Sequence, residues 1–354
     1  VEQPPSRYSA GCSVEVFTAK LKTHLFILHV LILWLLVFTF LLFLTLCVTV
    51  IYIPLMLFGL LGNILTILVV WLRPHMRTST YLYLSSMAVS DLLILLLLPL
   101  DLYKLWRPRP WPLGDLACKL TMFLSECCTF CTILHITFLS LERYLAVCWP
   151  ITAKTVVTRR RTRAIIGCLW LSAAVSAAPV LVMVGVEDTD KRECRCTHFA
   201  ISSGLLSAMM ILSNLYFLVP LCILGVVYSL IGRTLWLRPK SSRRDQSHRN
   251  TVKMLGVIVL AFVLCWLPFH VGRTIFSLSL VFSDTYAPPD THLYFLYYLS
   301  QYFNLVSSVL FYLSAAVNPL LYNLMSARYR HATLHICKSA PTFSETSVTH
   351  QLDS

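Results

Sequence analysis

Residues 118–150 read CKLTMFLSECCTFCTILHITFLSLERYLAVCWP, and the rest of the predicted architecture is built around them. It begins with Cys118, carries the carboxylate of Glu126 among apolar and small residues, and ends with the triplet Glu142–Tyr144. As an α-helix rising about 1.5 Å per residue, Cys118 to Arg143 covers about 37 Å, more than the hydrocarbon core of a bilayer. The stretch therefore predicts a helix that reaches both faces of a membrane.

Glu126 lies in one outer third of this helix. A charge at membrane depth costs about 2.5 to 3.5 kcal/mol on insertion scales, and such residues face a wet cavity or pair with an opposite charge. We therefore expect Glu126 to face either a wet cavity or a cationic partner.

The composition agrees with a membrane protein. Of 354 residues, 57% are hydrophobic and 13% are charged, whereas charged residues make up about 25% of a soluble globular chain. Most of the 13 cysteines lie inside apolar runs, where cysteine packs as a small hydrophobic residue. Three cysteines are positioned for oxidation, namely Cys118, Cys194 and Cys196.

Seven apolar segments have the length of a membrane span, and helices are the expected spanning element because lipid cannot satisfy backbone polar groups. The sequence thus predicts an all-α, seven-helix transmembrane bundle. The segments lie near residues 45–72, 80–103, 117–148, 164–186, 204–236, 252–280 and 293–324. Residues 277–292 are expected to form a long third outer loop.

The basic residues fix the topology. Alternate loops and the C-terminal segment carry eighteen Lys and Arg residues, and the opposite loops carry six. By the positive-inside rule the first set is cytoplasmic, so the N-terminus is predicted to be extracellular. The net charge of +13 is thereby explained by topology, without a nucleic-acid partner.

The first residues do not fit this scheme. From His24 to Leu72 the chain is almost entirely apolar, and a helix of that length would measure about 74 Å, twice a bilayer. Lys20 and Lys22 before the apolar run resemble the start of a signal sequence. A signal sequence, an extra N-terminal span and a gene-model artefact all stay open. We divide the chain into an atypical segment 1–44, a seven-helix domain 45–324, and an amphipathic helix with a cytoplasmic tail, 325–354.

Two carboxylates mark the second span. Asp91 lies near the middle of a Leu-rich run, so it requires a partner or an ion, and Asp101 lies near the outer end. The sixth span contains Pro268, which removes a backbone hydrogen bond and kinks the helix. Arg273 lies outward of this kink, at the predicted depth of Glu126.

Further side chains near the two prolines are expected to face the bundle. Trp266 and Phe262 precede the kink at Pro268. In the seventh span Asn318 and Pro319 break helical hydrogen bonding at depth, and Tyr322 follows one turn later. Residues 325–337 are basic and amphipathic, which predicts a short eighth helix on the inner membrane surface.

Together these residues resemble the rhodopsin-like G-protein-coupled receptors, one motif to each span. The motifs are Asn63, Asp91, Glu142–Tyr144, Trp170, Pro220, Cys265–Pro268 and Asn318–Tyr322. Within that family, LPLDLYKLW (98–106), GDLACKL (114–120) and CWLPFHVGR (265–273) resemble the branch of the ghrelin (growth hormone secretagogue) and motilin receptors, the former more closely. The resemblance covers about residues 50–335.

This resemblance implies a multi-pass plasma-membrane receptor for an acylated peptide hormone. It would contact membrane lipid and signal through a heterotrimeric G protein to phospholipase C and calcium. The ligand-binding residues carried over are Asp101, Glu126, Arg273, Phe269 and Phe303, with Glu126 and Arg273 as a salt bridge that divides the pocket. The activation switch would comprise Phe262, Trp266, Pro268, Asn318, Pro319 and Tyr322. G-protein coupling would use Glu142, Arg143, Tyr144 and Tyr228, with Arg143 released from Glu142 on activation.

The resemblance also implies a disulfide from Cys118 to Cys194, with Cys196 as the competing partner. No organic cofactor is expected. We expect a sodium ion at Asp91, helped by Thr132, Ser314 and Asn318, and the alternative is a protonated Asp91 hydrogen-bonded to Asn318.

Two other classes of protein fit less well. Intramembrane carboxylates also mark transporters, but the sequence shows no internal repeat and seven spans do not divide into halves. No catalytic motif such as H-E-x-x-H, G-x-S-x-G or a phosphate loop is present, so an enzyme is not expected.

Overall fold

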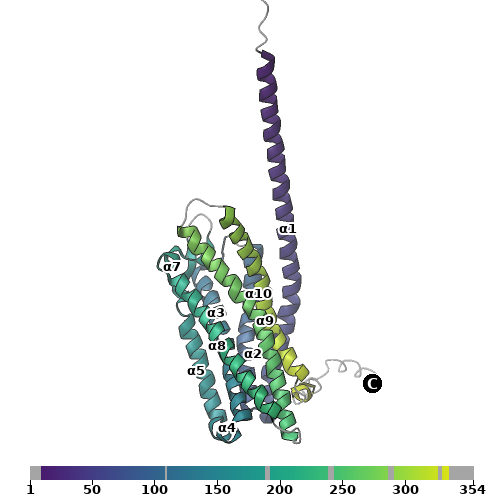
Figure 1. Ribbon diagram of the computed structural model, residues 1–354, viewed down its shortest axis with the longest axis vertical. Coiled ribbons are helices and arrows are strands. Elements are labelled where there is room, and N and C mark those ends of the chain that lie inside the picture. The colour runs from purple at the N-terminus through teal and green to yellow at the C-terminus, as the bar shows by residue number, and fades with distance from the viewer. Residues whose placement is uncertain are drawn as a thin grey trace, which may run out of the picture. The chain divides into compact units, whose positions relative to one another are not determined.

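The computed structural model describes residues 9–107, 110–187, 192–237, 243–285, 291–325 and 329–334, and it is dominated by α-helices (Figure 1). Seven helices in this part of the chain are long and apolar enough to cross a membrane. Their spanning segments are Phe38–Leu72, Ser79–Trp106, Gly114–Cys148, Arg159–Met183, Leu205–Leu237, Val259–Leu278 and Phe303–Leu321. The predicted seven-helix fold is confirmed.

The elements follow one another in a simple order. They are α1 (Ser9–Leu72), η1 (Pro74–Met76), α2 (Ser79–Trp106), α3 (Gly114–Cys148), α4 (Pro150–Val156), α5 (Arg159–Ala177), α6 (Val180–Met183), β1 (Val184–Glu187), β2 (Glu193–Cys196), α7 (His198–Ser202), α8 (Leu205–Leu237), α9 (Arg243–Thr285) and α10 (Thr291–Met325). A further helical turn covers residues 329–334, inside the predicted eighth helix.

The chain divides into two compact units, Val1–Ile51 and Tyr52–Ser354. In the first unit, α1 carries large apolar side chains that are mostly exposed, Leu25, Leu36 and Phe43 among them. The part of α1 that belongs to the second unit, Tyr52 to Leu72, lies in the first span.

Within the second unit, α3 is the central helix. It packs against α2, α5, α8 and α9, and against α4, α6 and β1 near its two ends (Figure 1). Its middle is buried on nearly every side, from Glu126 to Thr132. This position explains why α3 tolerates small and polar residues: its side chains meet other helices, and few of them meet lipid.

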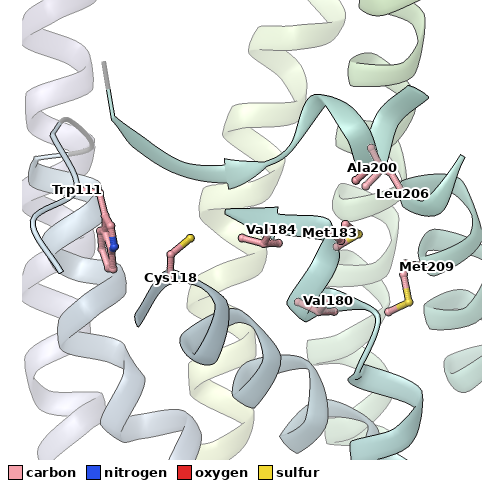
Figure 2. Packing of buried hydrophobic residues seen from close by; sticks show 8 residues of the cluster. All are labelled: Trp111, Cys118, Val180, Met183, Val184, Ala200, Leu206 and Met209. Atoms are coloured by element: carbon pink, nitrogen blue, oxygen red, sulfur yellow. The ribbon is translucent and has the colours of Figure 1, made fainter. Parts of the chain in front are cut away.

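The strands β1 and β2 form an antiparallel hairpin at one end of the bundle, which we term the hairpin end. Val186 pairs with Cys194, and Val184 pairs with Cys196. Figure 2 shows a buried apolar cluster gathered around the two strands. The cluster contains Trp111, Cys118, Val180, Met183, Val184, Ala200, Leu206 and Met209.

Two segments near the hairpin end differ from the sequence prediction. The fourth span was expected to run as helix to residue 186, but α5 ends at Ala177 and the chain is a strand from Val184. The reason is that Pro179 follows the end of α5 and the next residues pair with β2. The long outer loop predicted at 277–292 was wrong, since α9 continues to Thr285 and α10 begins at Thr291.

Close packing joins α1 to α10 where Pro319 interrupts the helix. Proline has no N–H, so the carbonyl of Ala315 lacks its usual donor within the helix. The Nδ2 atom of Asn63 donates to this carbonyl at 3.0 Å and to the Gly59 carbonyl at 2.9 Å. Asn63 on α1 therefore compensates for the proline on α10, which explains a fully buried amide in an apolar helix.

Gly62 permits this approach, and we expect Gly62→Ala to destabilise the bundle by roughly 1 to 3 kcal/mol through overpacking. An added Cβ would lie 2.9 Å from Cβ and 3.1 Å from Cγ of Pro319, whose ring cannot move aside. Thermal unfolding of the detergent-solubilised protein measures the effect. The matched control is Gly225→Ala, where a Cβ meets nothing within 4 Å; a helical alanine there should be neutral or stabilising. Equal unfolding temperatures for the two variants would contradict this packing account.

The residues 329–334 are tied to α1 by a side-chain hydrogen bond. The hydroxyl of Tyr329 lies 2.8 Å from Oγ1 of Thr66, and the Tyr329 side chain is buried. Burial raises the pKa of this phenol. The exposed Arg330 and buried Ala332 give this turn the amphipathic character that the sequence predicted.

Candidate functional site

An ion pair joins α3 to α9 in the half of the bundle nearer the hairpin end. Arg273 Nη1 donates to Glu126 Oε2 at 2.5 Å. The Glu126 side chain is 9% exposed and that of Arg273 is 24% exposed, so the pair is largely removed from water. Glu126 Oε1 has no hydrogen-bond partner among the described residues. The structure therefore brings together the two charges that the sequence placed at one depth.

Aromatic side chains lie on the side of this ion pair that is farther from the hairpin end. Trp266 and Phe262 are almost completely buried, with their ring centroids 5.7 Å apart. The Trp266 ring packs edge-on against Phe311 of α10 at 5.3 Å, and Phe269 stacks on Phe311 at 5.2 Å. The rings connect α9 to α10, and the contact of Phe262 with Phe217 extends the packing to α8.

The segment of α9 around Pro268 lies against α10. Ser307 Oγ donates to the carbonyls of Pro268 at 2.9 Å and of Phe303 at 2.6 Å. A Cβ added at Gly272 would lie 3.5 Å from the Phe303 backbone and 3.1 Å from Ser307 Oγ. This segment of α9 is therefore held by a polar contact that can break, and not by apolar packing alone. This is suitable for a hinge.

Asp101 has partners of its own. Its carboxylate accepts a hydrogen bond from the hydroxyl of Tyr312 on α10, and Lys104 Nζ lies 3.9 Å from its other oxygen. Lys104 also lies over the Trp111 ring, 5.1 Å from the centroid. The Asp101 side chain remains 44% exposed. Part of the hydrogen-bonding capacity of Asp101 is already used by the Tyr312 hydroxyl. The role of Asp101 in ligand binding stays a prediction.

Sequence reasoning missed several polar residues at this level of the bundle. His270 is buried and stacks on Phe217 at 4.6 Å, but neither ring nitrogen has a hydrogen-bond partner in the described part of the chain. The buried hydroxyl of Ser213, one turn before Phe217, is likewise unpaired there. Asn214 Nδ2 donates to Thr274 Oγ1 at 3.0 Å and links α8 to α9. Unpaired buried polar atoms could have been expected only from the three-dimensional packing.

Asp91 lies deep in the bundle and is bonded to Asn318, whose Nδ2 atom donates to Asp91 Oδ2 at 2.9 Å. The Thr132 hydroxyl lies 2.9 Å from that of Ser90, and Ser314 donates to the Phe311 carbonyl. Of the four residues predicted to hold sodium, the structure thus joins two directly. The side-chain oxygens of these four residues are of the kind that a hard cation prefers. The hydrogen bond from Asn318 to Asp91 fits the alternative, a protonated Asp91, equally well.

We propose that sodium binds at Asp91 and lowers agonist affinity by favouring the inactive arrangement. Asp91→Asn should abolish the sodium dependence of agonist binding, because an amide supplies no charge to hold the cation. Thr132→Val should weaken that dependence, since it removes one oxygen ligand. Competition binding with sodium chloride against choline chloride measures both. An Asp91→Asn variant as sensitive to sodium as the wild type would exclude the ion and leave the hydrogen-bonded alternative.

At the opposite end of the bundle, which carries α4, the structure differs from the expected pairing of Glu142 with Arg143. Glu142 is buried and accepts hydrogen bonds from Ser79 Oγ and from Thr162 Oγ1, the latter at 3.3 Å. Glu142 and Arg143 form no ion pair, although both are described, and Arg143 Nε is buried without a hydrogen-bond partner in the described chain. The carboxylate of Glu142 is instead hydrogen-bonded by the hydroxyls of Ser79 on α2 and Thr162 on α5.

The other residues predicted to couple to a G protein lie near this end. The Tyr228 hydroxyl is 3.4 Å from Ser140 Oγ, and its ring lies beside Gly256 of α9. Tyr144 accepts a hydrogen bond from Trp149 Nε1 at 3.4 Å. Tyr322 lies in α10, but its side chain falls outside the described residues, so its predicted role stays a prediction.

The hairpin is fixed to α3 by a covalent bond and an ionic contact. Cys118 and Cys194 form the predicted disulfide. Asp115 Oδ1 accepts a hydrogen bond from the Val186 amide at 2.9 Å, and Lys119 lies 2.6 Å from its other oxygen. Asp115 and Cys118 share one helix face, and Val186 is paired with Cys194. The strand register thus selects Cys194 over Cys196.

Comparison with known proteins agrees with this architecture. Residues 62–322 match the family model described as 7 transmembrane receptor (rhodopsin family). The chain belongs to this family, and is therefore a multi-pass receptor of the plasma membrane rather than an enzyme.

Among individual relatives, the chain is 53% identical to growth hormone secretagogue receptor type 1 of Sus scrofa over 306 residues, which covers 83% of this chain and 81% of the relative. The identity to the same receptor of Homo sapiens is 51% over the same coverage. The motilin receptor of Homo sapiens is 42% identical over 343 residues, with 82% of this chain and 80% of that receptor covered.

Proposed function

We propose that the chain is a receptor for the acylated peptide hormone ghrelin. Agonist binding would activate a heterotrimeric G protein, then phospholipase C and calcium release. The N-terminus and the hairpin end would be extracellular and the α4 end cytoplasmic, as the positive-inside rule predicts. The identity of 51 to 53% to growth hormone secretagogue receptors, against 42% to the motilin receptor, supports this choice of ligand.

The single observation that carries the proposal is the ion pair between Glu126 and Arg273. It crosses the bundle between α3 and α9, on the hairpin side of the aromatic residues Trp266 and Phe269. A buried ion pair is weak evidence for stability, but it fixes geometry. Here it would divide the ligand site into two parts, one for the acyl group and one for the peptide, and its ions would meet polar groups of the ligand.

Activation would be a shift between two helix arrangements, so the agonist must bind one of them more tightly. Contact with Trp266 and Phe262 would change the packing of α9 on α10 and α8. The inner part of α9 would then swing about Pro268, where Ser307 holds the kink through one hydrogen bond. The opening beside Tyr228 and Arg143 would admit the G protein.

The proposal is tested by calcium release in cells that express the chain, after separate addition of acylated ghrelin, unacylated ghrelin and motilin. We expect a strong response to acylated ghrelin, and weak responses to the other two peptides. A larger response to motilin would reassign the ligand. No response to any of the three at normal surface expression would refute the proposed function.

A further inference from the structure

We propose that Ser79 and Thr162 are positioning residues for G-protein coupling: their hydroxyls hold Glu142 and thereby keep Arg143 without a carboxylate partner. The inference rests on the proposed function, because it assigns a role within the coupling of this receptor to a G protein. It concerns the inner ends of α2, α3 and α5, which contribute Ser79, Glu142 and Thr162 respectively.

The side chains of Ser79, Glu142 and Thr162 lie within hydrogen-bonding distance of one another. Ser79 Oγ donates to Glu142 Oε2, Thr162 Oγ1 donates to Glu142 Oε1 at 3.3 Å, and the two hydroxyl oxygens lie 2.7 Å apart. The hydroxyls carry two hydrogens between them. They either give both to the carboxylate, or give one directly and share the other between themselves. In each case both carboxylate oxygens face hydroxyl groups from neighbouring helices.

The contacts of Glu142 with the hydroxyls are shielded from water by burial. Glu142 is 7% exposed and Thr162 is 1% exposed, so water does not compete effectively for these contacts. A buried carboxylate needs donors or a cation, and hydrogen bonds to a charged group are about twice as strong as neutral ones. With the two hydroxyls in place, the carboxylate is accommodated without the guanidinium of its neighbour Arg143. Without them, Arg143 is the neighbouring residue that can compensate the charge.

Arg143 forms no ion pair with Glu142, although both residues are described. Its Nε atom is buried and has no hydrogen-bond partner in the described part of the chain. A guanidinium with an unused Nε donor at the cytoplasmic end can form a hydrogen bond with a backbone carbonyl or carboxylate of a partner protein. The hydroxyl pair and Arg143 thus compete for one carboxylate, and the outcome sets how readily Arg143 contacts the G protein.

The test uses full-length receptor in lipid nanodiscs, with nucleotide exchange on an added G protein as the readout. For the double variant Ser79→Ala/Thr162→Val we expect agonist-free exchange to fall about ten-fold, as loss of hydrogen bonds to a charged group implies. Thr162→Ser keeps the hydroxyl and should retain near wild-type exchange. Thr137→Val is the matched control, because Thr137 is also buried but donates only to the Ile133 carbonyl of its own helix.

A second background separates positioning from simple loss of structure. In a Glu142→Gln receptor the carboxylate is absent, so adding Ser79→Ala/Thr162→Val should cause little further change in exchange. Equal ten-fold losses in both backgrounds, or a loss in Thr137→Val as large as in the double variant, would overturn the inference. Agonist affinity should be unchanged to within about two-fold in the folded variants, since the site lies at the other end of the bundle.

Failure of the inference can be told from failure of the proposed function. If the wild-type receptor does not stimulate exchange with or without acylated ghrelin, the proposed function is wrong. If the wild type responds to acylated ghrelin and the hydroxyl variants match it at every agonist concentration, the function stands and the positioning role is refuted.

Discussion

Replacing either member of the Glu126–Arg273 pair is expected to reduce agonist potency by about 100-fold or more. Removal of one partner leaves the other charge buried, which costs roughly 3 to 5 kcal/mol for a desolvated pair, and about 1.4 kcal/mol is a factor of ten. Both side chains are mostly removed from water, so this range applies to them. The measurement is the calcium response of Glu126→Gln and Arg273→Gln at matched surface expression.

The double variant shows whether the two residues act as a unit. If they form one bridge, Glu126→Gln/Arg273→Gln should be little worse than either single variant. Lys119→Gln is the control, because it breaks an ion pair with Asp115 whose members are 34% and 49% exposed, and such pairs contribute about 0 to 1 kcal/mol. Strictly additive losses would show that the two residues contact the ligand separately, and the divided site would have to be abandoned.

Loss of the Cys118–Cys194 disulfide is expected to abolish high-affinity agonist binding and most surface expression. The bond closes a sequence separation of 76 residues, and removing such a constraint costs roughly 2 to 5 kcal/mol. It also frees the hairpin, which would then be held to α3 chiefly by Asp115. Binding and surface expression of Cys118→Ser and Cys194→Ser measure the effect.

The neighbouring cysteine supplies the control for this prediction. Cys196→Ser should bind agonist like the wild type, because Cys196 lies outside the disulfide, on the same strand. Peptide mapping under non-reducing conditions should recover Cys118 linked to Cys194. Recovery of Cys118 linked to Cys196, or a Cys196→Ser receptor as impaired as Cys194→Ser, would contradict the strand register described above.

The sequence was sufficient for features that depend on the membrane. The spans follow from apolar length, and the depth match of Glu126 with Arg273 follows from helix rise and from the need of a buried charge for a partner. The position of Pro319 also implied a freed carbonyl. Each of these inferences needs only the sequence of one helix, or the depth of a residue in the membrane.

Features that depend on rotation of one helix against another could not be predicted in this way. Nothing in the sequence indicates that Tyr312 donates to Asp101, or that Ser79 and Thr162 donate to Glu142. The adjacent Glu142 and Arg143 suggested a pair, but neighbours along a helix point about 100° apart, and hydroxyls from two other helices were nearer. The helical extension of α9 into residues 279–285 was missed because SLVFSDT lacks a strong helical pattern.

Recognition of the acylated peptide is measured by competition binding to the purified receptor in lipid nanodiscs, with acylated ghrelin, unacylated ghrelin and motilin as competitors. Binding is measured without cellular signalling, so it reports recognition alone. Our account predicts that acylated ghrelin displaces a labelled agonist at a concentration at least about 100-fold lower than unacylated ghrelin, because burying the apolar acyl chain contributes about 0.8 kcal/mol per methylene. It further predicts that this preference is lost in Arg273→Gln. Equal displacement by the acylated and unacylated peptides, or stronger displacement by motilin, would contradict it.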